Sequence, residues 1–218
     1  MTLDLRCYLV TSGTGRRTVE AAAAAAAGGA GMIQVRAKSA TTAELLELTR
    51  AVASAVHQAQ PAARVVVDDR ADVAFAARRL GAQVHGVHLG QEDLPVAAAR
   101  ALLGPEAIIG LTTGTIETVR RAEELHDLLD YVGAGPFRPT PTKESGRQPL
   151  GTSGYRALVA ATRLPVVAIG GITVADVASL ARTGIAGVAL VREIMDADDP
   201  ELTAREVVTA LGRPPARR

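Results

Sequence analysis

Short apolar runs alternate along this chain with longer segments in which apolar residues recur at helical spacing. The runs are rich in β-branched residues and apolar on both faces, which is typical of strands in a buried parallel sheet. They cover residues 5–11, 32–36, 64–69, 86–90, 107–113, 131–135, 164–171 and 186–191. The segments between them predict helices. The first contains the alanine run Ala21–Ala27 and ends at Gly28-Gly29, because alanine favours a helix and glycine ends one.

Eight strand–helix units in 218 residues fit one β/α (TIM) barrel, in which parallel strands close into a cylinder inside a ring of helices. No linker or change in composition marks a second domain, so we expect a single β/α-barrel domain over residues 1–218. A doubly wound open sheet shows the same alternation of elements and is the alternative fold, because periodicity does not reveal whether a sheet closes.

Composition narrows the class of protein. Hydrophobic residues make up 48% and charged residues 22%, as in ordinary soluble proteins. The net charge of +1 and the 2% aromatic content argue against a nucleic-acid partner, which requires a basic face or base-stacking rings. The first residues show no secretion signal, and the alanine run is too short to cross a bilayer, so we expect no membrane partner.

The single cysteine, Cys7, excludes an intrachain disulfide and a thiolate metal cluster, and it fits the reducing cytoplasm. Because Cys7 lies in an apolar run, we expect its thiol to be buried and inert. The sequence leaves the oligomeric state open, and a homo-oligomer is compatible with it.

Polar residues gather where the predicted strands end. Gln34, Arg36 and Lys38 alternate at the end of the second strand, so all three side chains can point the same way. The later strand ends carry Asp68-Asp69-Arg70, Asp93, Thr112-Thr113, the loop residues Thr140, Thr142 and Lys143, Gly170-Gly171, and Val191-Arg192. In a β/α barrel the carboxyl ends of all strands meet at one face, where enzymes of this fold place their chemistry.

Each feature alone also has a purely structural explanation. A basic strand end is ordinarily solvated, Asp69 and Asp93 are good helix N-caps, and Gly170-Gly171 suits a tight turn. Only their joint occurrence at one rim favours a functional site.

The charges at this rim indicate the kind of ligand. Arg36, Lys38 and Lys143 supply positive charge, which alone suffices to bind a phosphate. Asp69 and Asp93 beside them require a cation, and Mg²⁺ commonly binds one or two carboxylates together with phosphate oxygens and water. We therefore expect Mg²⁺ as the cofactor, bound with a pyrophosphate.

A second anion site is expected where strands seven and eight end. Glycine backbone amides at this place form the usual monophosphate site of β/α barrels. Two anionic substrates at one rim suggest a reaction that joins them.

Eight segments, in order along nearly the whole chain, resemble the motifs of the thiamine-phosphate synthase family. They are YLVT, IQVRAK, VVVDDRADVA, GVHLGQEDLP, IIGLTT, DYVGAGPFRPTPTK, VVAIGGIT and GVALVREI. GPFRPTPTK and HLGQEDLP are the most specific, whereas AIGGIT occurs in many phosphate-binding barrels. The resemblance implies a transferase that joins hydroxymethylpyrimidine pyrophosphate and thiazole phosphate to thiamine phosphate and releases pyrophosphate. It also implies a dissociative route, in which the C–O bond breaks first and the thiazole nitrogen traps the cation.

The resemblance implies roles for the rim residues as well. The pyrimidine pyrophosphate would be bound by Gln34, Arg36, Lys38, Asp68, Thr112 and Lys143. Of these, Arg36, Lys38 and Lys143 would be catalytic, because they stabilise the departing pyrophosphate. The thiazole phosphate would be bound by Thr140, Thr142, Gly171, Val191 and Arg192. Asp69 and Asp93 would bind Mg²⁺. The prolines around Thr140 and Thr142 restrict their loop, so that its polar groups face the rim at a reduced cost in entropy.

This chain departs from the family pattern at three positions. Asp68 stands where the family usually has asparagine, and we expect its carboxylate to accept a hydrogen bond from the pyrimidine amino group. Thr112 stands where the family usually has serine. Thr113-Gly114 lacks the histidine often found after that serine, which the related thiazole tautomerase uses. We therefore favour the synthase over a tautomerase-like or non-catalytic phosphate-binding barrel. Of His88, in strand four, and His85, just before it, one could contact the site, but we expect a packed or capping histidine.

Overall fold

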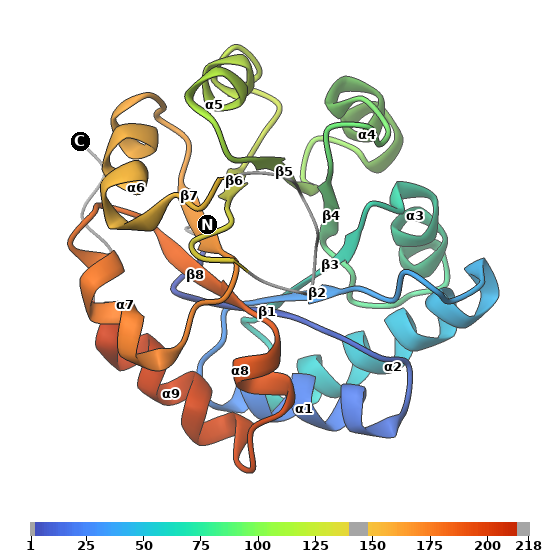
Figure 1. Ribbon diagram of the computed structural model, residues 1–218. Helices are drawn as coiled ribbons and strands as arrows, with labels where there is room; N and C mark the ends of the chain where they lie inside the picture. Colours follow the sequence, from blue (N-terminus) through green and yellow to red (C-terminus); the bar gives the residue numbers. More distant parts are fainter. Residues whose placement is uncertain (1–2, 140–147, 213–218) are drawn as a thin grey trace.

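The computed structural model describes residues 3–139 and 148–212. Within them, eight parallel strands close into a barrel in chain order, with the helices forming a ring outside it (Figure 1). Closure is direct, because β1 pairs with β8 through Cys7 and Val188, and the alternative open sheet is therefore wrong. The strands are β1 (Cys7–Val10), β2 (Met32–Val35), β3 (Arg64–Asp68), β4 (Gly86–Leu89), β5 (Ile108–Thr113), β6 (Tyr131–Ala134), β7 (Val166–Ile169) and β8 (Gly187–Leu190).

Helices follow the strands as the periodicity predicts, and the alanine run forms the first of them. They are α1 (Arg16–Ala27), α2 (Thr42–Ala59), α3 (Ala71–Arg79), α4 (Val96–Leu103), α5 (Ile116–Glu123), α6 (Gly151–Ala160), α7 (Val174–Ala181), α8 (Arg192–Met195) and α9 (Pro200–Leu211). Helix α1 ends at Ala27 with Gly28 as its C-cap, as expected for a glycine stop. Among the helices that the structure describes, none has the length and apolar character that a bilayer crossing requires.

The alternation along each strand separates two packed layers. Side chains such as Leu9, Ile33 and Val65 face outward and pack with the helices in the larger cluster of buried residues. Those at the alternate positions, such as Tyr8 and Val66, form a smaller cluster inside the barrel. Because the strands are covered on both faces, their apolar character on both faces is explained.

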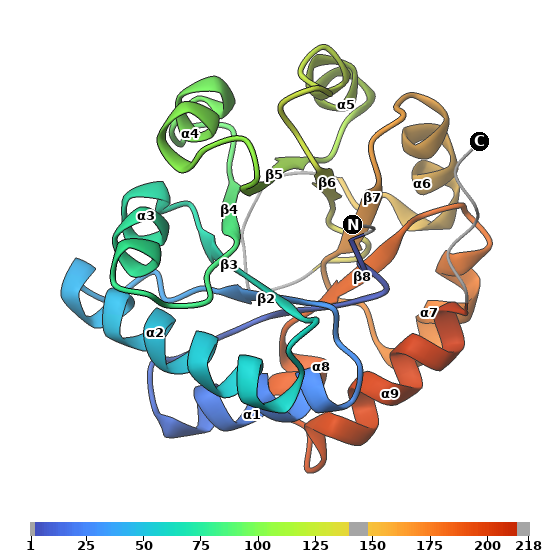
Figure 2. The same cartoon turned by 180° about the vertical axis from the view of Figure 1, so that it is seen from behind.

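The two mouths of the barrel differ. At the N-terminal mouth, Leu5 is buried and joins the interior cluster, with Leu3 packed against it. Figure 2 shows the backbone of this first segment passing beside β8. A side chain at Gly187 would collide with the Leu5 carbonyl, so the first segment lies tightly against β8. Nearby, Cys7 is fully buried, as expected, and this burial raises the pKa of its thiol to about 12, which disfavours the reactive thiolate. Among the described residues, the cavity inside the barrel therefore opens at the C-terminal mouth.

Candidate active site

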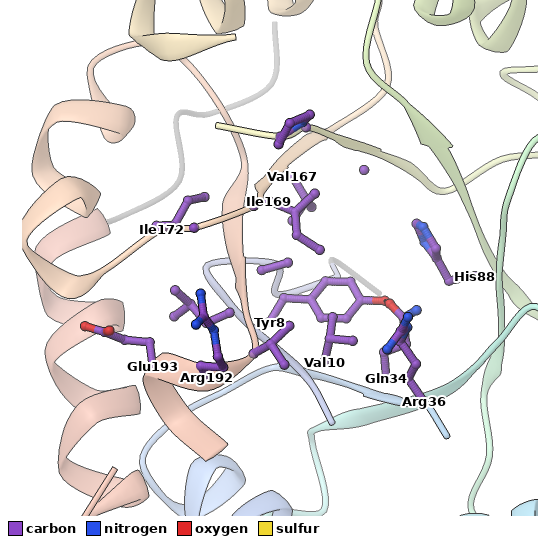
Figure 3. A pocket seen from close by; sticks show the side chains of 18 of the residues that line it. Tyr8, Val10, Gln34, Arg36, His88, Val167, Ile169, Ile172, Arg192 and Glu193 are labelled. Carbon is purple, nitrogen blue, oxygen red and sulfur yellow. The ribbon is translucent and has the colours of Figure 1, made fainter. Parts of the chain in front are cut away.

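A cavity of about 480 Å³ opens at the C-terminal ends of the strands (Figure 3). Seven of the predicted site residues line this one cavity: Gln34, Arg36, Asp68, Thr112, Gly171, Val191 and Arg192. Its wall also includes apolar side chains, among them Val10, Val167 and Ile169. The volume is within the range of pockets that enclose a small organic molecule.

Asp68, at the end of β3, organises the charged side of the mouth. Its Oδ1 accepts a hydrogen bond from Gln34 Nε2 at 2.5 Å. Its Oδ2 lies 3.4 Å from Arg36 Nε and 3.3 Å from Lys38 Nζ. The side chains of Gln34, Arg36 and Lys38 thus converge on one carboxylate, as their alternation along the chain predicts. Since the Asp68 side chain is only 11% exposed, these charged contacts are poorly screened by water.

Asp69 and Asp93 lie beside the cavity rather than in its wall. The Asp69 carboxylate pairs with Lys38 Nζ, and Asp93 Oδ2 accepts from the Gly90 backbone N–H at 2.6 Å. A Cβ on Gly90 would lie 2.7 Å from Asp93 Oδ2 and 4.0 Å from Asp69 Oδ1, so both carboxylates border the same glycine. The structure therefore brings together two acidic residues that are distant in sequence.

The alternative that these aspartates are helix caps is wrong. The N-caps of α3 and α4 are Arg70 and Pro95, and neither helix has a side-chain cap. Asp69 has φ of 59°, a left-handed conformation that costs a residue with a Cβ about 1 kcal/mol. The turn that carries this carboxylate is thus held in an unusual conformation next to the charged side of the mouth.

Gly170 and Gly171 form the opposite side of the mouth, after β7. Their φ values are 104° and 69°, which favour glycine. A Cβ on Gly170 would lie 2.7 Å from Pro136 Cα, because the segment after β6 packs directly on this turn. Phe137 N and Arg138 N donate to the carbonyls of Ile169 and Gly170. The glycines therefore do more than form a tight turn: they allow a second chain segment to reach the cavity.

Helix α7 begins just beyond this turn with its first amides already occupied. Thr173 and Asp176 form a capping box, and Val174 N donates to Glu193 Oε1 at 2.9 Å. Asp176 is also paired with Arg138 at 2.5 Å, which connects the segment after β6 to α7. Thr140, Thr142 and Lys143, which follow that segment, lie outside the described residues.

Three residues that sequence reasoning did not assign to the site belong to it. His88, Tyr8 and Tyr131 line the cavity. His88 is packed against Tyr131, as expected, and it also contacts the site, which was the alternative. Figure 3 shows His88 facing the cavity and the Tyr8 hydroxyl pointing toward Gln34. The alternation of side chains along β4 could have identified His88, because it stands two residues from Gly86 on the inward face of the strand. Inward direction alone does not say which side chains meet across a closed barrel.

Comparison with known proteins gives a consistent result. A family model described as thiamine monophosphate synthase matches residues 7–194. The thiamine-phosphate synthases of Corynebacterium jeikeium (strain K411) and Corynebacterium efficiens are each 57% identical to this chain. The alignments cover 95% of this chain and 94% of the first protein, and 97% of both chains for the second. The solved structure of a thiamine phosphate pyrophosphorylase from Pyrococcus furiosus matches with a TM-score of 0.82 and 33% identity, covering 96% of each chain.

Proposed function

Because this chain belongs to the thiamine monophosphate synthase family, we propose that it joins hydroxymethylpyrimidine pyrophosphate to thiazole phosphate. The products are thiamine phosphate and pyrophosphate, and the enzyme is a transferase. The observation that carries the proposal is that one and the same cavity has a charged side at β2–β3 and a glycine side at β7–β8. Two anionic substrates can reach one reaction centre from these two sides.

The charged side suits the pyrimidine pyrophosphate. Gln34, Arg36, Lys38, Asp68, Thr112 and Lys143 form its proposed binding set. Arg36, Lys38 and Lys143 stabilise the charge that gathers on pyrophosphate as it leaves, and such preorganised charges are among the largest contributions to catalysis. Arg36 has a single ion pair among the described residues, so most of its guanidinium donors are available to a ligand.

The glycine side suits the thiazole phosphate, with Thr140, Thr142, Gly171, Val191 and Arg192 as its proposed binding set. Bond formation needs the two substrates close together: the C–O bond of the pyrimidine methylene breaks, its electron pair leaves with pyrophosphate, and the thiazole nitrogen supplies the pair for the new C–N bond. Val10, Val167 and Ile169 lie between the two sides (Figure 3). Their apolar surfaces keep water away from the carbon that would otherwise be hydrolysed.

Asp69 and Asp93 are the proposed ligands of Mg²⁺. In residues 3–139 and 148–212, no three acidic, histidine or cysteine side chains gather as around a fully protein-bound metal. Two neighbouring carboxylates fit a Mg²⁺ ion that takes its other ligands from phosphate oxygens and water. When bound, Mg²⁺ neutralises part of the pyrophosphate charge. Lys38 pairs with Asp68 and Asp69, so its ammonium group lies next to the proposed metal ligands. We propose that it binds the same pyrophosphate as the Mg²⁺ ion.

The proposal is tested by measuring pyrophosphate release with both substrates and with each one omitted. Release that requires both, with thiamine phosphate formed in equal amount, is the expected result; release from one substrate alone, or none, would refute it. The synthase names of the relatives give no support to the tautomerase-like or non-catalytic alternatives. A cytoplasmic location is part of the proposal, supported by the single buried thiol.

A further inference from the structure

A row of hydrogen bonds crosses the interior of the barrel along the wall of the cavity. At one end, Asp68 of β3 accepts from Gln34 of β2, whose Oε1 accepts from the Tyr8 hydroxyl of β1 at 2.8 Å. The Tyr8 and Tyr131 hydroxyl oxygens lie 2.7 Å apart, which brings in β6. All four side chains are buried or nearly so. Each of these hydrogen bonds therefore takes the place of a hydrogen bond that the polar group would make with water.

The row continues through His88 of β4 to β5. His88 Nδ1 lies 3.0 Å from the Tyr131 hydroxyl, and His88 Nε2 lies 3.0 Å from Thr112 Oγ1. Two glycines make room for the rings. A Cβ on Gly110 would collide with the Tyr131 ring and lie 2.6 Å from His88 Nδ1, and one on Gly133 would lie 3.1 Å from His88 Cε1. The row therefore joins six of the eight strands, and all of its residues, from Asp68 at one end to Thr112 at the other, line the cavity.

The donors and acceptors in this row can be assigned from one end. A carboxylate only accepts, so Gln34 presents its NH₂ group to Asp68 and its oxygen to Tyr8. Tyr8 then donates to Gln34, and its oxygen accepts from Tyr131. Burial raises the pKa of both phenols, so each retains the one proton that it donates.

The same reasoning assigns the two ring nitrogens of His88. Because Tyr131 donates its proton to Tyr8, its oxygen must accept from His88 Nδ1–H. In the neutral imidazole, Nε2 is then an acceptor, and Thr112 donates its hydroxyl proton to it. Every hydrogen bond in the row points from Thr112 toward Asp68.

We propose that Tyr8, Tyr131 and His88 are positioning residues that couple Asp68 to Thr112, so that Thr112 presents only oxygen lone pairs to the cavity. Asp68, where the family resemblance leads us to expect asparagine, sets this direction, because an amide could either donate or accept. Thr112 then suits an N–H donor or a developing positive charge of the substrate. It does not suit a phosphate oxygen, so this inference revises the pyrophosphate role that the resemblance implies for Thr112.

The direction of the row is tested by the position of the proton on His88, which does not depend on the enzyme's activity. Long-range ¹H–¹⁵N correlation spectra of the ¹⁵N-labelled protein distinguish the two neutral tautomers from the imidazolium. His88→Gln identifies the His88 signal among the 4 histidines. The expected wild-type ring is neutral, with its proton on Nδ1. A proton on Nε2, in the other tautomer or in the imidazolium, would overturn the proposal.

A pair of matched variants tests the connection through Tyr131. Tyr131→Phe removes the acceptor of Nδ1–H together with the proton donated to Tyr8, so the His88 proton should move to Nε2 and point at Thr112. Tyr155→Phe removes an equally buried hydroxyl that bonds instead to the Ala134 carbonyl at 2.8 Å, and it should leave the His88 signal unchanged. An unchanged His88 tautomer in Tyr131→Phe would show that the row is not coupled.

The consequence for ligands rests on the proposed function and has its own test. Thr112→Val keeps the side-chain shape and removes the hydroxyl. If Thr112 only accepts, binding of inorganic pyrophosphate with Mg²⁺, measured by calorimetry, should change less than about twofold, while turnover with both substrates falls about tenfold. Thr112→Ser should restore most of the turnover. Tenfold weaker pyrophosphate binding in Thr112→Val would overturn the acceptor role. Wild-type protein that is inactive with both substrates would refute the proposed function and leave the spectroscopic result intact.

Discussion

At the N-terminal end of the barrel, Arg100 donates to the backbone carbonyls of Ala107 and Leu128 and pairs with Asp130 at 3.1 Å. Asp130 in turn accepts from Ile109 N at 2.8 Å. At the C-terminal end, Arg36 has one ion pair among the described residues, at 3.4 Å to Asp68. An arginine and an aspartate thus meet at both ends. At the N-terminal end the arginine has several hydrogen-bond partners, whereas at the C-terminal end most N–H donors of the arginine have no partner among the described residues.

The difference indicates what each end contributes. Arg100 donates to partly buried carbonyls where β5 and β6 begin, so its hydrogen bonds stabilise the fold. Arg36 and Lys38 both pair with the Asp68 carboxylate at the edge of the cavity. Their remaining N–H donors are available to an anionic ligand. We therefore expect variants at the C-terminal end to affect turnover and variants at the N-terminal end to affect stability.

The largest expected effect is on turnover. Asp69→Ala and Asp93→Ala should each lower kcat by about two to three orders of magnitude, because each removes a proposed Mg²⁺ ligand beside the leaving group. Thermal unfolding should remain within a few degrees of wild type, since neither carboxylate caps a helix. Full activity of the wild-type enzyme in excess chelator would contradict the magnesium assignment.

The glycine side of the mouth is tested by Gly170→Ala. A Cβ there would meet Pro136 at 2.7 Å in addition to the strain of a positive φ, so the free energy of unfolding should fall by about 3 kcal/mol. Gly81→Ala is the matched control, because Gly81 has φ of 82° and open space around its Cβ position. It should cost only about 1 kcal/mol. Equal losses in urea denaturation would show that Pro136 does not constrain the turn.

A crossed pair tests the comparison directly. Arg100→Met should lower the free energy of unfolding by about 2 kcal/mol, because partly buried carbonyls and the Asp130 carboxylate lose their donor, and should leave kcat unchanged. Arg36→Met should change stability by less than about 0.5 kcal/mol and lower kcat/KM for the pyrimidine substrate at least about tenfold. If both variants altered the same property, the proposed division between the two ends would be wrong.

The smallest effect concerns His85, at the N-terminal end of β4. Burial, together with the nearby Arg64, lowers the pKa of His85 to about 4, and its Nδ1 accepts from Val65 N. The unfolded chain has the ordinary pKa of about 6.5 and therefore binds more protons between these values. The contribution of His85 to stability is complete above pH 6.5 and is lost as the pH falls toward 4, by about 1–2 kcal/mol.

Unfolding of wild type and His85→Gln at pH 7 and pH 5 isolates this contribution. Glutamine can still accept from Val65 N but does not titrate, so the variant should lose less stability on acidification, with kcat unaffected at pH 7. The same loss in both proteins would show that His85 does not account for the acid sensitivity.

Much of the fold follows from the sequence because its signals are local. Strand and helix periods repeat eight times, and the alternation of Gln34, Arg36 and Lys38 indicates that they point the same way. The position of polar groups at strand ends then places the candidate site at one mouth of a barrel. The roles of the individual site residues stay predictions.

Relations between strands were decided only by the tertiary structure. Closure through β1 and β8 brings Tyr8 next to Tyr131, which is 123 residues away in the chain, and packing around Gly110 fixes the contact of Tyr131 with His88. The positive φ of Asp69 is likewise a property of the folded turn. The physical reason is that the period of a strand specifies the face on which a side chain lies. The register and closure of the whole sheet specify which side chain it meets there.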